Sequence, residues 1–177
     1  MPEERLSSKR IYDGRVVKLR VDTIRKENGE ETIREVIEHD PVIAAVALDN
    51  DDTILFVKQY RTPTGKELLE IPAGGVNAGE DPEAAVRREM QEETGFRPGR
   101  LVRLGGVYSA PGFTDEYLDI YLATDLEPDR LHAEDTDEIV LVRVPLTDVP
   151  ALVASGKIED AKTLAALYLL QEYRKSA

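Results

Sequence analysis

Residues 74–96 read GGVNAGEDPEAAVRREMQEETGF, and they are the most informative part of the sequence. They predict a glycine-containing loop followed by one helix over residues 81–94. Asp81 is a preferred N-cap residue, Pro82 suits the first helical position, and Gly95 suits the position just after a helix. The helix therefore has a defined start and a defined end.

The two faces of this helix differ in character. Glu89, Glu92 and Glu93 lie at positions i, i+3 and i+4, so their carboxylates share one face. They stand in the last turns, where the helix dipole disfavours negative charge. Such an acidic face is usually only solvated surface, but a divalent cation bridging the carboxylates would remove their repulsion. The opposite face carries three apolar residues and predicts packing on a sheet: Ala85, Val86 and Met90.

Apolar segments on either side of the helix predict strands. The segment Val42 to Leu48 is nearly continuously apolar, as in a strand covered on both faces, and Asn28-Gly29 is a two-residue hairpin signal. We expect an N-terminal β lobe over residues 1–40 and the main domain over residues 41–177. The expected strands are 16–24, 31–38, 42–48, 54–60, 68–72, 101–108, 116–124 and 139–144, with further helices at about 146–155 and 161–175.

The composition limits the classes of function. A chain of 177 residues, 41% hydrophobic and 33% charged, suits one soluble folded domain. Its apolar runs are far shorter than the roughly 20 residues of a membrane span, so we expect no membrane partner. The polar start lacks a secretory signal, and we expect a cytoplasmic protein. The net charge of −12 argues against nucleic acid as a partner.

Rare residue types restrict the chemistry further. The sequence has no Cys, which excludes disulfides, thiolate zinc sites and a Cys nucleophile, and it has only two His. A metal in this protein should therefore be a hard, oxygen-liganded cation, Mg²⁺ or alternatively Mn²⁺. Such a cation would also compensate the charge of an anionic substrate.

The fixed positions of residues 74–96 follow the pattern GX5EX7REUXEEXGU, in which U is apolar. Every defined position of this pattern, the Nudix box, matches, and the chain therefore resembles the Nudix hydrolase family. The resemblance implies an α/β fold, an α/β/α sandwich on a mixed sheet. It also implies metal-dependent hydrolysis of a nucleoside diphosphate linked to another group.

The resemblance assigns roles within the box. Arg88 would orient Glu89 or Glu80 through a bidentate contact, and Arg88 and Glu92 count as candidate catalytic residues. One metal ion would neutralise pyrophosphate oxygens, and a second would lower the pKa of an attacking water. The implied metal ligands are Glu89, Glu93, the backbone carbonyl of Ala73 and, as a ligand or a partner of the ligands, Glu92.

Flanking segments resemble the ADP-ribose-cleaving subgroup of this family. Residues 109–116, SAPGFTDE, are close to its SPGFTDE segment and lie at the subgroup's spacing from the box. The resemblance implies substrate contacts from Pro111, Gly112 and Glu116. Glu116 would face the terminal ribose hydroxyls, for which a carboxylate is a suitable acceptor.

Three further segments agree with this subgroup: residues 34–39, REVIEH, residues 59–61, QYR, and residues 69–74, LEIPAG. Arg34 and Arg61 would contact the substrate, and Glu70 is also a candidate substrate-binding residue. In the subgroup the N-terminal lobe commonly exchanges between protomers, so the resemblance implies a homodimer with sites completed across the interface.

The catalytic base remains open between several residues. In the resembling enzymes it is an acidic residue on a loop before the last strand, which here is residues 134–138, EDTDE. Asp135 and Asp137 are favoured by position, and Glu138 is a further candidate, with Glu134 nearby.

The resemblance implies Mg²⁺-dependent hydrolysis of ADP-ribose to AMP and ribose 5-phosphate by attack of water. One alternative is hydrolysis of another nucleoside diphosphate sugar, such as GDP-mannose or ADP-glucose, or of a dinucleoside polyphosphate. The segment around Pro111 speaks against these substrates. Another alternative is a Nudix-fold ligand sensor without turnover, against which the intact glutamates of the box speak.

Overall fold

A computed structural model describes residues 3–133 and 138–176. The chain divides into two compact units. The N-terminal unit comprises Met1–Pro41 and Tyr108–Tyr117, and the main unit comprises Val42–Val107 and Leu118–Ala177. Among the described residues, no helix is long and apolar enough to cross a membrane.

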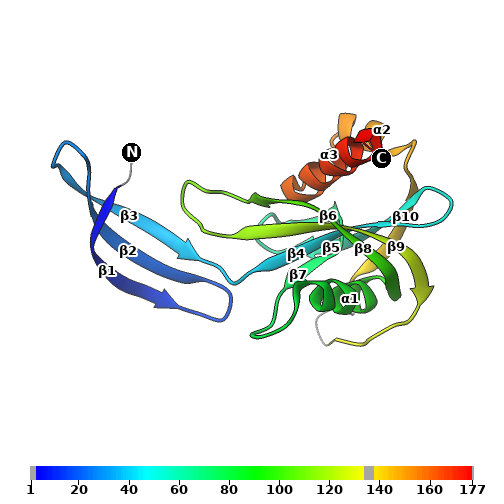
Figure 1. The fold of residues 1–177 in the computed structure, drawn as a ribbon, viewed down its shortest axis with the longest axis horizontal. Helices are drawn as coiled ribbons and strands as arrows, with labels where there is room; N and C mark the ends of the chain where they lie inside the picture. Colours follow the sequence, from blue (N-terminus) through cyan, green and yellow to red (C-terminus); the bar gives the residue numbers. More distant parts are fainter. Residues whose placement is uncertain (1–2, 134–137, 177) are drawn as a thin grey trace. The chain divides into compact units, whose positions relative to one another are not determined.

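The N-terminal unit is built on a three-stranded antiparallel sheet in the order β1-β2-β3 (Figure 1). Its strands are β1 (Glu4–Asp13), β2 (Lys18–Arg25) and β3 (Glu31–Glu38). The sequence did not predict β1, because this segment is polar and all ten of its residues are exposed. Backbone hydrogen bonds with β2 define this strand. Neither of its faces is buried, so its sequence does not alternate between apolar and polar residues.

The hairpin between β2 and β3 is present where the Asn28-Gly29 signal predicts it, but its loop is longer than two residues. Lys26 donates its backbone N–H to the carbonyl of Glu30, which encloses three residues. Gly29 has φ of 83°, a left-handed conformation that glycine adopts without strain. Three-residue loops with glycine at this position are a common hairpin form.

The loop of residues 108–117 belongs to the N-terminal unit, although it lies far away in the sequence. Ile37 at the end of β3 donates to the carbonyl of Phe113 at 2.8 Å and accepts from the backbone N–H of Asp115 at 3.3 Å. His39 donates its backbone N–H to the Asp115 carboxylate at 2.8 Å. These contacts tie the loop to the end of the N-terminal sheet.

The main unit contains a seven-stranded mixed sheet whose central order is β10-β5-β4-β9-β8, with β6 paired to β5 and β7 paired to β4 (Figure 1). The neighbours β4 and β9 are parallel, whereas β4 and β5 are antiparallel. The strands are β4 (Val42–Leu48), β5 (Thr53–Arg61), β6 (Lys66–Glu70), β7 (Ala73–Gly75), β8 (Phe96–Tyr108), β9 (Tyr117–Pro128) and β10 (Val140–Pro145).

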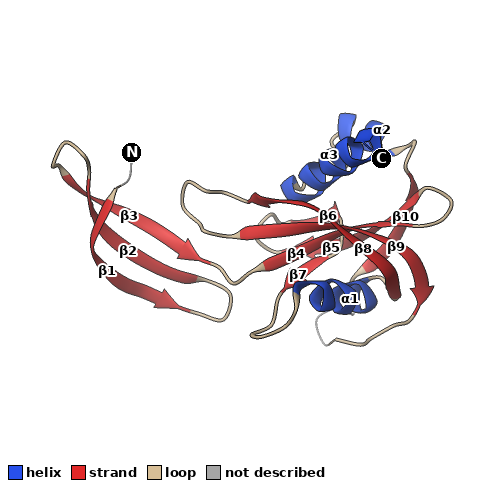
Figure 2. Cartoon of the chain, in the orientation of Figure 1, coloured by secondary structure: helices blue, strands red, loops and turns tan. Residues whose placement is uncertain are grey.

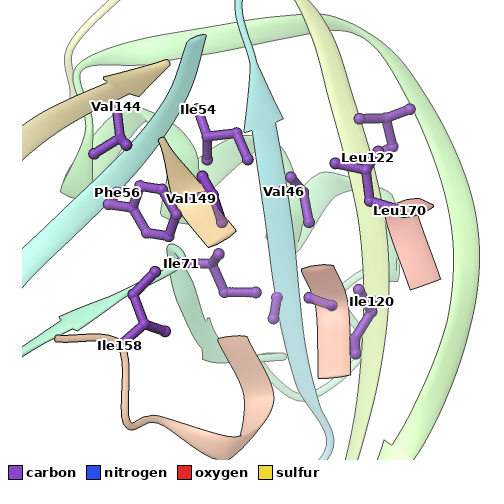
Figure 3. Close-up of a cluster of buried hydrophobic side chains, with 12 residues drawn as sticks. Val46, Ile54, Phe56, Ile71, Ile120, Leu122, Val144, Val149, Ile158 and Leu170 are labelled. Carbon is purple, nitrogen blue, oxygen red and sulfur yellow. The ribbon is translucent and has the colours of Figure 1, made fainter. Parts of the chain in front are cut away.

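Helices cover both faces of this sheet, as Figure 2 shows. Alternate residues of β4 point to opposite sides: Ile43 and Ala45 pack with α1 (Pro82–Glu93), and Ala44 and Val46 pack with α2 (Val149–Ala154) and α3 (Ala161–Ser176). Figure 3 shows the core on the α2 and α3 side. The predicted α/β/α sandwich is confirmed, and the predicted docking face of α1 is fully buried: Ala85, Val86 and Met90.

The ends of α1 agree with the sequence signals. Asp81 is the N-cap, and its side chain accepts a hydrogen bond from the backbone N–H of Ala84 at 3.1 Å. Gly95 follows the C-cap residue Thr94 and has φ of 80°. Helix α2 is shorter than the predicted 146–155, because residues 146–148 form a turn. The short strand β7 was not predicted.

Candidate active site

The acidic face of α1 lines a pocket of the main unit with a volume of about 290 Å³. The C-terminal turns of α1 and strand β7 form part of its wall, and the end of β5 contributes Arg61 and Gln59. The complete lining is Gln59, Arg61, Ala73, Gly74, Gly75, Arg88, Glu89, Glu92, Glu93 and Ile139. The structure therefore brings together in one cavity the predicted metal ligands Ala73, Glu89, Glu92 and Glu93, together with Arg61 and Arg88.

Glu93 is the most buried carboxylate of the pocket, with 6% of its surface exposed. Its Oε2 accepts the backbone N–H of Ala73 at 3.0 Å, which joins the end of α1 to β7. Burial raises the pKa of Glu93 to about 8, and the negative charge of Glu89 adds to this rise. The pocket thus holds a carboxylate that the protein alone does not fully compensate.

Glu89 lies directly over the backbone of β7. A Cβ atom at Gly74 would come within 2.1 Å of the Glu89 carboxyl carbon, so glycine is required for this close approach. At Gly75, one residue further along, a Cβ would meet no atom within 4 Å. The absence of a side chain at Gly74 therefore sets the position of the Glu89 carboxylate.

Arg88 connects the carboxylates of the box. Its Nε and Nη2 donate to the two oxygens of Glu80 at 2.9 and 3.0 Å, and Nη2 also donates to the carbonyl of Gly75 at 2.8 Å. Its Nη1 donates to Glu89 at 2.6 Å and to Glu92 at 3.1 Å. Arg88 thus forms the bidentate contact with Glu80 and holds the side chains that border the pocket.

The carboxylates of the pocket are directed at protein donors in this structure. Within the described ranges, no group of three or more His, Asp or Glu side chains is arranged as a ready metal site. Glu89 and Glu92 pair with Arg88, and Glu93 accepts from Ala73. The donor set nevertheless fits a hard cation, because it offers several carboxylate oxygens beside a backbone strand.

Arg61 reaches the pocket from the end of β5. Its Nε and Nη2 donate to the two carboxylate oxygens of Glu70 at 2.8 and 2.7 Å. Glu70 is only 1% exposed, accepts a further hydrogen bond from Lys162, and is not among the residues that line the pocket. Glu70, predicted to contact substrate, therefore has its carboxylate engaged inside the protein.

Comparison with known proteins gives two family matches. The NUDIX domain model matches residues 38–167, and a model described as the nucleoside diphosphate sugar hydrolase N-terminal domain matches residues 3–37. The chain belongs to the Nudix hydrolase family. The resemblance carried by residues 74–96 is thereby confirmed.

Several relatives match nearly the whole chain. An ADP-ribose pyrophosphatase of Bacillus subtilis is 36% identical over 97% of this chain and 94% of its own length. The methanol dehydrogenase activator of Bacillus methanolicus is 36% identical over 96% of this chain and 92% of its own length. A GDP-mannose pyrophosphatase of Yersinia pestis is 34% identical, but over 67% of this chain and 64% of its own length.

A solved structure confirms the Nudix fold. The crystal structure of an ADP compounds hydrolase aligns with a TM-score of 0.91 and covers 99% of this chain and 96% of its own. The two sequences are 23% identical. At this identity the likeness concerns the fold.

Four predicted substrate-binding residues belong to the N-terminal unit, whereas the residues that line the pocket belong to the main unit. Arg34 on β3 is exposed and pairs with Glu3. Pro111 and Gly112 are exposed in the turn of the 108–117 loop. Glu116 lies 3.6 Å from Nε2 of His39.

The candidates for the catalytic base are only partly described. Asp135 and Asp137, with Glu134, lie outside the described residues. Glu138 is exposed and stands in a turn before β10. Glu92 is the candidate catalytic carboxylate that lines the Nudix pocket.

Sequence reasoning assigned no role to two residues near the pocket. Gln59 lines the pocket beside Arg61, because side chains two residues apart on a strand point to the same face. The prediction for Arg61 could therefore have been extended to Gln59. Lys162 does not line the pocket but contacts Glu70. Residues 160–163, DAKT, resemble the start of the last helix in the ADP-ribose-cleaving subgroup, and this resemblance gave Lys162 no role.

Proposed function

We propose that this chain is a Mg²⁺-dependent Nudix pyrophosphohydrolase that cleaves ADP-ribose into AMP and ribose 5-phosphate. The observation that carries the reaction class is the single pocket lined by Glu89, Glu92, Glu93 and Arg61. Its carboxylates suit a divalent cation, and its arginine suits a phosphate. The near full-length relatives named ADP-ribose pyrophosphatase support the choice of substrate.

The metal ligands of this proposal are Glu89, Glu93, the backbone carbonyl of Ala73 and Glu92. Each carboxylate has two oxygens, so Glu89 and Glu92 can bind a cation through lone pairs other than those that accept from Nη1 of Arg88, which lies 2.6 Å and 3.1 Å from them. Arg88 also contacts Glu80 and Gly75 and acts as a positioning residue. When bound, the cation supplies charge stabilisation at the pyrophosphate oxygens and activation of water.

The reaction that follows is a displacement at phosphorus. The water oxygen forms a bond to one phosphorus of the pyrophosphate, and the bond from that phosphorus to the bridging oxygen breaks. A carboxylate accepts the proton of the water, and the candidates are Glu92, Asp135, Asp137 and Glu138. Arg61 offsets the charge that remains on the phosphates.

The N-terminal unit supplies the remaining substrate contacts in this proposal. Arg34 contacts the substrate, Pro111 and Gly112 shape the loop beside it, and Glu116 accepts hydrogen bonds from the terminal ribose hydroxyls. We place Arg34 in the site of a partner subunit within a homodimer. The large exposed hydrophobic side chains of the N-terminal unit, such as Ile11 and Ile33, support such an assembly.

The proposed setting is cytoplasmic, with a nucleotide sugar as the small-molecule partner and no role for nucleic acid or membrane. A net charge of −12 supports the exclusion of nucleic acid. Nucleic acids repel a protein of this charge unless it carries a basic patch.

A direct test is incubation of the purified chain with ADP-ribose and Mg²⁺, with the products separated by chromatography. We expect AMP and ribose 5-phosphate in equal amounts, and none after chelation of the metal. Turnover that persists in the chelator would contradict the proposal. Substitution of Mn²⁺ for Mg²⁺ in the same assay establishes which ion supports the higher rate.

The second candidate is hydrolysis of GDP-mannose, favoured by the relatives named GDP-mannose pyrophosphatase, which match over 67% of this chain. A third reading, a ligand sensor, predicts binding of a nucleotide sugar without release of products. The same assay distinguishes both alternatives from ADP-ribose hydrolysis. The first predicts faster turnover of GDP-mannose, and the second predicts no products from either compound.

A further inference from the structure

Two cations converge on the buried carboxylate of Glu70. Nε and Nη2 of Arg61 donate to the two carboxylate oxygens at 2.8 and 2.7 Å, and Nζ of Lys162 donates to one of these oxygens. The side chain of Glu70 is 1% exposed and that of Lys162 is 15% exposed, whereas that of Arg61 is 39% exposed. Of these three residues, only Arg61 lines the pocket formed by Glu89, Glu92 and Glu93, hereafter the carboxylate pocket.

Lys162 is held in place by the start of α3. Asp160, just before the helix, accepts from the backbone N–H of Thr163 at 3.0 Å and from its hydroxyl at 2.6 Å, a capping contact. The same hydroxyl accepts the backbone N–H of Ile71 at 3.0 Å. Nζ of Lys162 also lies 3.0 Å from Asp160. The lysine is therefore fixed to the segment that joins β6 to β7.

The contact with Glu70 uses one edge of the Arg61 guanidinium. Nε and Nη2 are occupied, and within residues 3–133 and 138–176 the structure records no hydrogen bond from Nη1. Guanidinium presents donors in a rigid planar fork, so fixing one edge also fixes the direction of the remaining donors. Nη1 is the group of Arg61 that remains for an anion in the pocket.

We propose that Lys162 is a positioning residue for the substrate phosphates, acting through Glu70 on Arg61. The identity of the anion rests on the proposed function, but the chain of contacts does not. Glu70 belongs to this device as the relay between Lys162 and Arg61, in place of the direct substrate contact that its sequence position predicted.

The physical reason lies in the compensation of a buried charge. Burial acts to raise the pKa of Glu70, but contacts with Arg61 and Lys162 outweigh it and hold the pKa below its ordinary value. Without Lys162, Arg61 becomes the only strong partner of a carboxylate removed from water. The guanidinium is then drawn further into that pair and is less available to the substrate.

The test is binding of a non-hydrolysable methylene analogue of ADP-ribose, measured by calorimetry with Mg²⁺. The variants are Lys162→Met, Lys162→Arg, Arg61→Ala and the double variant of Lys162→Met with Arg61→Ala. Lys66→Met serves as the matched control, because the Lys66 side chain pairs with Glu159 at the surface. Thermal unfolding of each variant separates loss of folding from loss of binding.

We expect Lys162→Met to raise Kd roughly 10- to 100-fold, Lys162→Arg to restore most of the affinity, and Lys66→Met to leave Kd unchanged. In the Arg61→Ala background, Lys162→Met should cause no further loss, because the effect passes through Arg61. In turnover assays the same loss should appear in KM, with kcat changed less than about twofold.

The results distinguish this proposal from the proposed function. Equal losses from Lys162→Met with and without Arg61 would overturn the positioning role, as would an unchanged Kd or a failure of the native chain to bind the analogue. A native chain that binds the analogue but does not cleave ADP-ribose would refute the proposed function alone. The Kd comparison then still decides the role of Lys162.

Discussion

At the level of single residues, the position of the Glu89 carboxylate depends on the absence of a side chain at Gly74. Glu89 occupies the space that a side chain at Gly74 would fill. The family pattern predicted a glycine at this position from the sequence. Its physical reason, the approach of Glu89 to the backbone of β7, becomes visible only in the structure, because β7 was not predicted.

We predict that Gly74→Ala lowers kcat/KM for ADP-ribose by roughly 10- to 100-fold and raises the Mg²⁺ concentration needed for half-maximal activity. The added Cβ would lie 2.1 Å from the Glu89 carboxyl carbon, so this flexible side chain must move. Gly75→Ala is the control, since its Cβ meets nothing within 4 Å. Equal activities of the two variants would refute this role of Gly74.

The individual site residues were predicted unevenly. Ala73, Glu89, Glu92 and Glu93 were found from one continuous motif, and they do line one pocket. Glu70 was assigned to the substrate because residues 69–74 resemble a segment of the subgroup, and in the structure it is buried against Arg61 and Lys162. Sequence spacing identifies the residues of a motif. It does not reveal which of these residues are covered by a distant part of the chain. Lys162, which contacts Glu70, is 92 positions away from it.

At the scale of elements, helix α1 was predicted most accurately, because its signals are local. Asp81, Pro82 and Gly95 act on neighbouring backbone groups, and all three are where a helix boundary requires them. Strands β1 and β7 were missed, because each is defined by pairing with another strand and lacks an apolar alternation of its own. Such pairing is a property of the tertiary structure.

The loop before α1 supplies a pH-dependent contribution to stability. Contacts with Arg88 and the backbone N–H of Asn77 lower the pKa of Glu80 to about 2. Because the folded-state pKa is depressed, this contribution is present above the unfolded-state value of about 4.5 and is lost as pH falls from there towards 2.

We predict that Glu80→Gln unfolds at lower denaturant concentration than the native chain at pH 7, and that the difference shrinks between pH 4.5 and pH 2. Urea unfolding of both proteins across this range measures it. Glu83→Gln, in the first turn of α1, is the control, since Glu83 is an exposed partner of Arg87. A difference that stays constant across the range would contradict the assignment.

At the scale of the whole molecule, the two units differ in how they are stabilised. The main unit buries both faces of its sheet under helices. In the N-terminal unit only Asp22 and Ile24 are buried among the described residues, and every residue of β1 is exposed. A sheet must cover at least one face to be stable, so this unit lacks burial that a second protein surface would supply.

We predict that the native chain forms a dimer through its N-terminal unit, with a mass in solution twice 19.8 kDa. Replacing Ile11 and Ile33, which are 51% and 59% exposed, with Asp should shift the mass to that of a monomer and lower activity. Light scattering after size-exclusion chromatography measures the mass.

The matched control for the dimer is Val153→Asp, which changes an exposed hydrophobic residue of the main unit. It should remain dimeric. A monomeric native chain with full activity would contradict the predicted assembly. So would a dimer that is insensitive to both changes in the N-terminal unit.

The membership of the 108–117 loop in the N-terminal unit could not be predicted locally. The segment reads as a turn in the sequence, and it is one, but its contacts with Ile37 and His39 join residues more than 70 positions apart. Pro111, Gly112 and Glu116, the residues assigned to the substrate from this loop, therefore belong to the same unit as the N-terminal sheet and Arg34.

Values of kcat/KM across a panel of substrates test whether the chain hydrolyses ADP-ribose in the carboxylate pocket. The panel is ADP-ribose, ADP-glucose, GDP-mannose and a dinucleoside tetraphosphate, each with Mg²⁺ and beside Glu93→Gln. We predict the highest kcat/KM for ADP-ribose, release of AMP and ribose 5-phosphate, and loss of both in Glu93→Gln. A higher kcat/KM for any other compound, or undiminished turnover by Glu93→Gln, would contradict this function.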